Sequence, residues 1–304
     1  MKIFFTILLI ISGSAFDLQA NNTISDYFDK CRKIGNSDYA TEMQIMKEFG
    51  NSDLVEILTP YYTDTVAFVR QQSYYLTYKK GLEQPDKAQS IVDCFVQKLN
   101  SEKDSGLRGT VIGYLQAFPV SAFEEEAKSV IATNLNNPNS PHFEDLVLLA
   151  GFIGTGNNEL FQLSLTPNLS TLKKWNVSLA LARLNSEDAL KYCIDKVKKA
   201  PVNSGMVTYL LPDLIYTRKK EALDYCIELL YSDEKLCQTA NPDMSESILC
   251  AYPIIELIAP VIVDFPIQVN PSIGLDTDDY EKLLQTVRTW LTENKEYKIK
   301  TGNF

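Results

Sequence analysis

The feature that most restricts the fold of this chain is a six-residue pattern that occurs twice at a fixed distance. Ala-Leu-x-Tyr-Cys-Ile starts at Ala189 and again at Ala222, 33 residues later. Around each copy the apolar residues follow the i, i+1, i+4, i+5, i+8 spacing of an amphipathic helix that buries one face. An identity at a fixed offset, with the same helical periodicity around it, predicts a helical repeat architecture.

Helix starts are expected at similar intervals along the rest of the chain. They fall near Asp53, Asp86, Ala122, Asn158, Glu187 and Lys220. Second helices are expected between them, at residues 65–80, 107–118, 143–153, 172–184, 206–218 and 247–263. No segment shows sustained apolar/polar alternation, so no sheet is expected. Pro212, Pro253 and Pro260 lie within helical patterns and should kink or interrupt those helices.

One segment of this repeating region resembles a known family. Residues 64–73, Asp-Thr-Val-Ala-Phe-Val-Arg-Gln-Gln-Ser, resemble the Asp-x4-Val-Arg-x2-Ala signature of HEAT-type repeats, with Ser73 in place of Ala. Residues 107–111 resemble a divergent copy of the same Val-Arg element, and residues 179–184 are similar to the small-residue core of a HEAT second helix. The resemblance covers roughly residues 53–263. It implies an all-α fold, a right-handed α-solenoid of about six stacked helix pairs with terminal capping helices.

The first residues have the composition of a targeting segment. Met1-Lys2 precedes an apolar run, small residues follow, and Ala20 stands before a polar stretch, which is the order of a secretory signal peptide. Cleavage is expected after Ala20 or after Ala15, and a short uncleaved anchor is the alternative. No Cys ends the apolar run, so no lipid anchor is expected. The mature protein is therefore expected to be secreted or periplasmic, without membrane insertion.

Four parts are expected along the chain. Residues 1–20 form the signal peptide, residues 21–52 an N-terminal helical cap, and residues 53–263 the HEAT-like helical repeats. Residues 264–304 provide a linker, a C-terminal capping helix and a polar tail. The tail from Lys295 to Phe304 is expected to fray, because polar chain ends rarely find packing partners.

Six cysteines are compatible with disulfide bonds in an exported chain. Cys237 and Cys250 flank a polar loop and are the pair most suited to a bridge, which would stabilise the fold by roughly 3 kcal/mol. The alternative is that all six are buried thiols that act as small hydrophobic residues. No Cys-x-x-Cys pair is present, so redox motifs and zinc ribbons are not supported.

Charge and histidine content limit the chemistry. The chain has 29 Lys and Arg against 39 Asp and Glu, a formal charge of −10, which disfavours nucleic-acid partners. His142 is the single histidine, so multi-histidine metal sites are excluded. The acidic stretches at residues 124–126 and 276–281 are explained as helix starts, and the glycines of 151–156 as a helix end and turn. We therefore expect no catalytic, cofactor-binding or metal-ligating residues, and no cofactor.

The aromatic content is the remaining functional signal. Tyr61, Tyr62, Tyr74, Tyr75 and Tyr78 are candidate partner contacts, and packing between repeats is the alternative. Together these features predict an exported, non-enzymatic scaffold or binding protein with an acidic, tyrosine-containing surface. Its partner would be a protein or peptide, which can be basic, and its oligomeric state is open. The alternatives are an extracytoplasmic hydrolase or glycan-handling accessory that uses acidic residues, and a structural component of a cell-envelope assembly.

Overall fold

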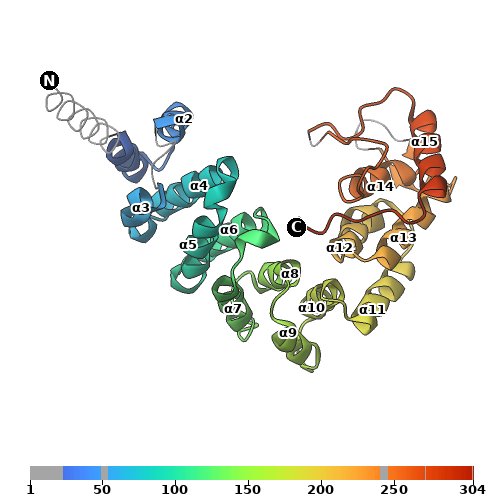
Figure 1. Cartoon of the computed structure of the whole chain (residues 1–304), viewed down its shortest axis with the longest axis horizontal. Helices are drawn as coiled ribbons and strands as arrows, with labels where there is room; N and C mark the ends of the chain where they lie inside the picture. Colours follow the sequence, from blue (N-terminus) through green and yellow to red (C-terminus); the bar gives the residue numbers. More distant parts are fainter. Residues whose placement is uncertain (1–22, 49–53, 240–245, 271, 303) are drawn as a thin grey trace, which may run out of the picture. The chain divides into compact units, whose positions relative to one another are not determined.

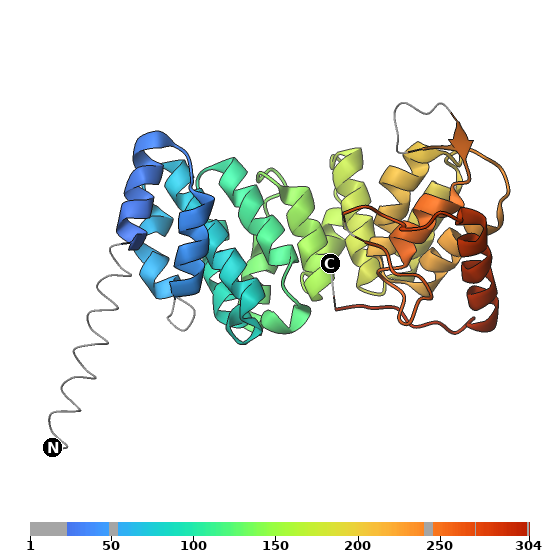
Figure 2. The ribbon, with the colours of Figure 1, turned by 90° about the horizontal axis from the view of Figure 1, so that it is seen from above.

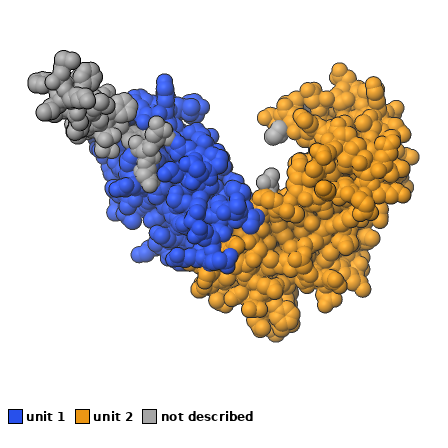
Figure 3. Space-filling model, viewed as in Figure 1, with its two compact units in different colours: residues 1–127 blue, residues 128–304 orange. Residues whose placement is uncertain are grey.

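The computed structural model describes residues 23–48, 54–239, 246–270, 272–302 and 304, and these residues are mostly helical (Figure 1). The prediction of an all-α class is therefore confirmed. The chain separates into two compact units, residues 1–127 and 128–304 (Figure 3). The predicted signal peptide, residues 1–20, lies outside the described residues. Among the helices in the described ranges, none has the length and apolar character needed to span a bilayer.

Unit 1 is built around one long helix, α4 (Ala67–Glu83), which contacts the helices before and after it. Residues 23–34 are helical and bury Ile24, Tyr27, Phe28 and Cys31. The remaining helices are α2 (Tyr39–Glu48), α3 (Leu54–Leu58), α5 (Ala88–Ser101), α6 (Ser105–Gln116) and α7 (Glu125–Asn134), the last of which crosses into unit 2; short 3-10 turns lie at Thr59–Thr63, Pro85–Lys87 and Val120–Ala122.

Unit 2 arranges its helices in two layers, which can be followed in Figure 1. In one layer α8, α10, α12 and α14 contact one another in succession, and in the other α11 contacts α13. The helices are α8 (Phe143–Ile153), α9 (Asn157–Ser164), α10 (Thr171–Arg183), α11 (Glu187–Lys198), α12 (Leu211–Tyr216), α13 (Lys220–Glu228), α14 (Ala251–Ile258) and α15 (Tyr280–Glu293), with a π-helical turn η4 (Met206–Leu210) and a 3-10 turn η5 (Leu229–Tyr231).

The same kind of turn follows three helices of unit 2. Gly154, Asn185 and Arg218 all have positive φ, at 79°, 72° and 54°, and each stands one or two residues after the end of α8, α10 or α12. A left-handed residue at this position ends a helix and reverses the chain. The helices predicted at residues 143–153 and 172–184 match α8 and α10 to within one residue.

A two-stranded hairpin corrects the expectation that no sheet is present. Strands β1 (Cys237–Gln238) and β2 (Ser247–Ile248) pair antiparallel, and the Sγ atoms of Cys237 and Cys250 are bonded at 2.03 Å. The helix predicted at residues 247–263 was wrong at its start, because β2 occupies those residues and α14 begins only at Ala251. The other four cysteines are thiols.

The prolines act at helix starts and ends. Pro212 lies in the first turn of α12, where a backbone N–H is not needed for the hydrogen bonds of that helix. The wider π-helical turn η4 precedes it. The helix predicted at residues 206–218 is therefore interrupted in the expected place. Pro253 lies in the first turns of α14, and Pro260 follows its end.

The prediction that the C-terminal tail frays was wrong. Residues 294–302, here called the C-terminal strap, return from α15 across unit 2 (Figure 2). The Val263 N–H donates to the Lys298 carbonyl (2.8 Å) and the Lys300 N–H to the Val261 carbonyl (2.8 Å). The Tyr297 hydroxyl donates to Asp224 Oδ1 (2.7 Å). These long-range bonds give the polar segment partners that its own sequence does not provide.

Candidate functional site

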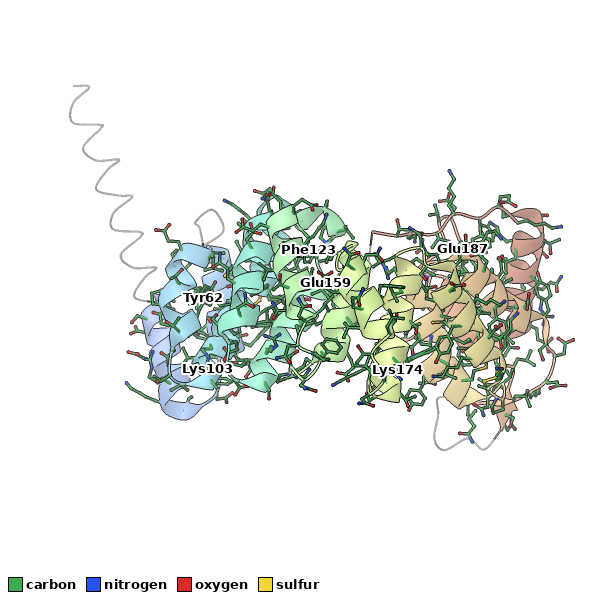
Figure 4. All side chains as sticks on the ribbon, turned by 90° about the horizontal axis from the view of Figure 1, so that it is seen from below. Tyr62, Lys103, Phe123, Glu159, Lys174 and Glu187 are labelled. Carbon is green, nitrogen blue, oxygen red and sulfur yellow. A yellow bond between two sulfur atoms is a disulfide. The ribbon has the colours of Figure 1, made fainter. Side chains whose placement is uncertain are left out.

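Two of the five candidate tyrosines belong to the core of unit 1. Tyr62 and Tyr74 are only 4% and 1% exposed, and Tyr62 is labelled in Figure 4. The hydroxyls of Tyr62 and Thr77 are hydrogen-bonded (2.6 Å), and the Tyr74 hydroxyl donates to Glu102 Oε2 (2.8 Å). Their assignment as partner contacts is therefore corrected, because rings and hydroxyls alike are used inside unit 1.

The other three tyrosines, Tyr61, Tyr75 and Tyr78, are half-buried. Tyr61 stacks on Phe28 with ring centroids 3.9 Å apart, and Tyr78 stacks on Tyr114 at 4.1 Å. Burial, followed by the nearby Tyr78 and Tyr75, raises the pKa of Tyr114 to about 12. Four of the five candidate tyrosines thus stack on other rings, which supports the packing role that the sequence left open; they are Tyr61, Tyr62, Tyr74 and Tyr78.

An open groove of about 600 Å³ lies in unit 2 and is here called the Trp175 groove. The first half of α10, the end of α11 and the turn η4 form it. The volume falls within the range typical of ligand sites. Its lining includes Leu172, Trp175, Lys196, Val197, Lys199 and Leu210.

Trp175 is held in a fixed orientation at this groove. Its indole Nε1–H donates to Asp213 Oδ2 in α12 at 2.5 Å, and the side chain is only 7% exposed. Burial raises the pKa of Asp213, and the bond from Trp175 partly opposes that shift. Because the buried indole donor and the buried carboxyl satisfy each other, the ring is locked against the groove.

Two lysines, Lys196 and Lys199, lie beside this apolar surface. Lys196 Nζ lies 4.8 Å from the centroid of the Trp175 ring and 5.6 Å from that of Tyr192, which are cation–π distances. Lys199 caps the end of α11 beside it. Leu172 is 60% exposed, which is high for a large apolar side chain. No Asp or Glu is among the lining residues, so the groove combines apolar contact area with positive charge.

His142 and the acidic residues 124–126, which were considered above for catalysis or metal binding, do not line the Trp175 groove. His142 is the N-cap of α8, with its Nδ1 3.2 Å from Asp145 Oδ2. Burial, followed by Glu124 and Glu126, raises the pKa of Asp93 in unit 1. Within the described ranges no three His, Cys, Asp or Glu side chains are grouped as a metal site would require.

The sequence contained a signal for the groove that periodicity alone did not reveal. Leu172 and Trp175 are three residues apart and share a helix face, which reads as an ordinary buried stripe. A better indication comes from Lys196, Lys198 and Lys199. These residues place three positive charges close together at the end of one helix, in a chain whose net charge is −10. The face becomes a groove only because η4 lies across from it, and that interruption depends on Pro212.

Comparisons with known proteins provide no relative for this chain. No family model matches it, and neither a curated protein nor a solved structure shows significant similarity to it. The features of the chain that bear on its function are therefore the two helix layers of unit 2, the turns that follow α8, α10 and α12, and the Trp175 groove.

Proposed function

We propose that the chain is an exported, non-enzymatic binding protein of HEAT-like solenoid architecture, and that its Trp175 groove holds a segment of a protein or peptide partner. The groove is the observation that carries the proposal: a fixed indole, an exposed leucine and two lysines around a depression of about 600 Å³. The two helix layers and the recurring turns of unit 2 support the repeat architecture. The signal-peptide pattern of residues 1–20 supports export.

The partner segment carries an apolar side chain flanked by acidic residues. Leu172 and Leu210 provide most of the apolar contact, because Trp175 is only 7% exposed, and Lys196 and Lys199 provide positive charge beside it. For the chain as a whole, the net charge of −10 favours a basic partner. At the groove the local charge has the opposite sign, and electrostatic complementarity is decided locally, at the surface that the partner reaches.

A direct test uses the tryptophan of the groove as its own reporter. The chain has two tryptophans, so Trp290→Phe leaves Trp175 as the only one. We would titrate this variant with Glu-Asp-Leu-Phe-Asp-Glu and with Lys-Arg-Leu-Phe-Arg-Lys, following fluorescence. The acidic peptide should bind about tenfold or more tightly than the basic one at low salt. The difference should shrink as salt screens the lysines.

Charge reversal in the groove provides the matched comparison. Lys196→Glu with Lys199→Glu should weaken binding of the acidic peptide about tenfold and leave the far-UV circular dichroism unchanged, because both lysines are exposed. Lys191→Glu reverses an exposed lysine of the same helix outside the groove lining and should change little. Equal affinity for the two peptides, or equal effects of the two kinds of reversal, would contradict the proposed site.

A further inference from the structure

A second hollow, of about 360 Å³, lies at the opposite end of α10 from the Trp175 groove. We call it the arginine pocket. Arg183 ends α10, Arg218 and Lys219 follow α12, and Thr301 of the C-terminal strap forms part of the wall. None of the residues that line it is Asp or Glu.

The repeat geometry brings these cations together. Arg183 and Arg218–Lys219 belong to corresponding turns of consecutive repeats, and the left-handed residues Asn185 and Arg218 shape those turns. The Arg183 Nη1–H donates to the Tyr216 carbonyl (2.6 Å), and Lys219 Nζ donates to Asn185 Oδ1 (2.5 Å), so the turn after α10 is tied to the turn after α12. In a chain of net charge −10, a hollow with three cations and no acidic side chain in its lining favours an anionic ligand.

Arg183 is held rigidly at the back of the pocket. It is 9% exposed, and its guanidinium carbon lies 5.0 Å from the Phe152 ring centroid and 4.7 Å from that of Tyr216. Burial lowers the pKa of Arg183 to about 10, so the group remains charged at neutral pH. A desolvated cation in a low-dielectric surrounding acts on a nearby anion more strongly than an exposed one does.

Arg218 lines the pocket with a guanidinium whose hydrogen-bonding capacity is only partly used by the described residues. Its Nη1 donates to the Ile215 carbonyl (2.7 Å) and its Nη2 to a main-chain oxygen of Phe304 (3.0 Å). Its Nε is buried and has no hydrogen-bond partner among the described residues. The Phe304 ring contacts Phe152 and Tyr216, with centroids 5.5 Å apart in both pairs. Because Nε of Arg218 is shielded from solvent, a ligand in the pocket would reach this side chain through the second N–H of Nη1 or of Nη2.

We propose that the arginine pocket binds a divalent tetrahedral oxyanion, phosphate or sulfate, free or as an ester on a larger ligand. Arg218 and Lys219 donate to it, and Arg183 supplies positive potential from behind. Three cations match a double negative charge better than the single charge of a carboxylate. The site is independent of the Trp175 groove and lies at the other end of α10.

The probes are sodium phosphate, sodium sulfate and sodium acetate, each compared with sodium chloride at equal ionic strength. Isothermal titration calorimetry and thermal unfolding of the full chain should show binding and an increase in Tm with phosphate and sulfate. Acetate should behave like chloride. If phosphate and sulfate stabilise the protein no more than chloride, the proposal is overturned, and a preference for acetate would overturn the divalent-anion assignment.

Two variants remove one cation each while suiting the local backbone. Arg218→Asn keeps a residue type that tolerates the left-handed conformation, and Lys219→Asn places a favoured residue at the N-cap of α13. Each should weaken phosphate binding about tenfold or more. Lys235→Asn removes the same charge from an exposed loop of unit 2 and should bind phosphate like the parent. An equal loss in all three variants would mean general charge screening and would contradict the site.

Discussion

The tyrosines of unit 1 and the tryptophan of the Trp175 groove in unit 2 have different surroundings. In unit 1 the rings meet one another: Tyr62 stacks on Tyr74 (centroids 5.8 Å apart), and Tyr78 stacks on Tyr114. In unit 2 Trp175 is fixed by Asp213 and faces a groove beside the exposed Leu172. A tyrosine-rich segment is therefore no indication of a binding surface by itself. Exposure of the neighbouring apolar residues is the better guide.

Two arginines, Arg70 in unit 1 and Arg183 in unit 2, have different partners. In unit 1 Arg70 forms a two-point ion pair with Glu102 (2.9 and 3.0 Å), which also accepts the Tyr74 hydroxyl. In unit 2 the buried Arg183 is bonded to a backbone carbonyl and packs between two rings. The charge of Arg70 is thus neutralised by a carboxylate, whereas the charge of Arg183 lies at the wall of a hollow.

The largest effect should come from breaking the ion pair of unit 1. Burial raises the pKa of Glu102, but hydrogen bonds from Arg70, the Asp104 N–H and Tyr74 outweigh it and hold the pKa below its ordinary value. Glu102→Gln should therefore lower the free energy of unfolding by about 3–5 kcal/mol at pH 7. Urea denaturation measures the change. Glu83→Gln, on the exposed face of α4, is the control and should stay within about 0.5 kcal/mol.

The same carboxyl gives a signed pH dependence. The pKa of Glu102 is lower in the folded protein than in the unfolded chain, where it is about 4.5. The stabilisation that Glu102 provides is therefore fully present above about pH 4.5, and it is lost as the pH falls through the folded-state pKa. The stability difference between the parent protein and Glu102→Gln should narrow over that acid range. A difference that is constant down to acid pH would contradict the role given to Glu102.

Unit 2 should respond to reductant, because its hairpin is closed by the Cys237–Cys250 bond, whereas Cys31 and Cys94 of unit 1 are thiols. Replacing both residues of the pair with Ser should cost about 3 kcal/mol. Dithiothreitol should produce the same loss in the parent protein and no further loss in the variant. A further loss in the variant would show that another bond is involved.

The smallest effects compare one glycine from each unit. A Cβ at Gly151 would lie 2.5 Å from the Tyr216 hydroxyl oxygen and 2.8 Å from the Ala180 Cα, so α8 and α10 would have to move apart. Gly151→Ala should cost about 1–3 kcal/mol. A Cβ at Gly113, in α6, would meet nothing within 4 Å, so Gly113→Ala should gain about 0.5–1 kcal/mol of helix propensity. Thermal unfolding of the two variants should show shifts of opposite sign.

The parts of the fold that sequence could predict are those set by local periodicity. The starts of α11 and α13 followed from the repeated pattern at Ala189 and Ala222, and Ser186 caps α11 as its residue type favours. The hairpin strands are two residues each, too short to show alternation. The C-terminal strap looked like a free end because its partners, residues 261–263, are distant in sequence.

The candidate site was less predictable, because burial depends on how helices meet. Tyr62 and Tyr75 belong to the same tyrosine-rich stretch, yet one is 4% exposed and the other half-buried. Trp175 lies on a helix face whose spacing is that of a core residue, and its groove needs the π-helical turn before Pro212. Local patterns report which face of a helix is apolar, and the opposing elements decide whether that face is covered.

The central claim is that the partner binds the Trp175 groove of unit 2 rather than the tyrosines of unit 1. The most direct measurement compares the affinity of Glu-Asp-Leu-Phe-Asp-Glu for two variants in the Trp290→Phe background, read from Trp175 fluorescence. Leu172→Glu places a carboxylate on an exposed position of the groove, and Tyr75→Glu places one on a half-buried position among the tyrosines of unit 1. The account predicts about tenfold or greater weakening for Leu172→Glu and none for Tyr75→Glu. Weakening by Tyr75→Glu with no effect of Leu172→Glu would contradict it.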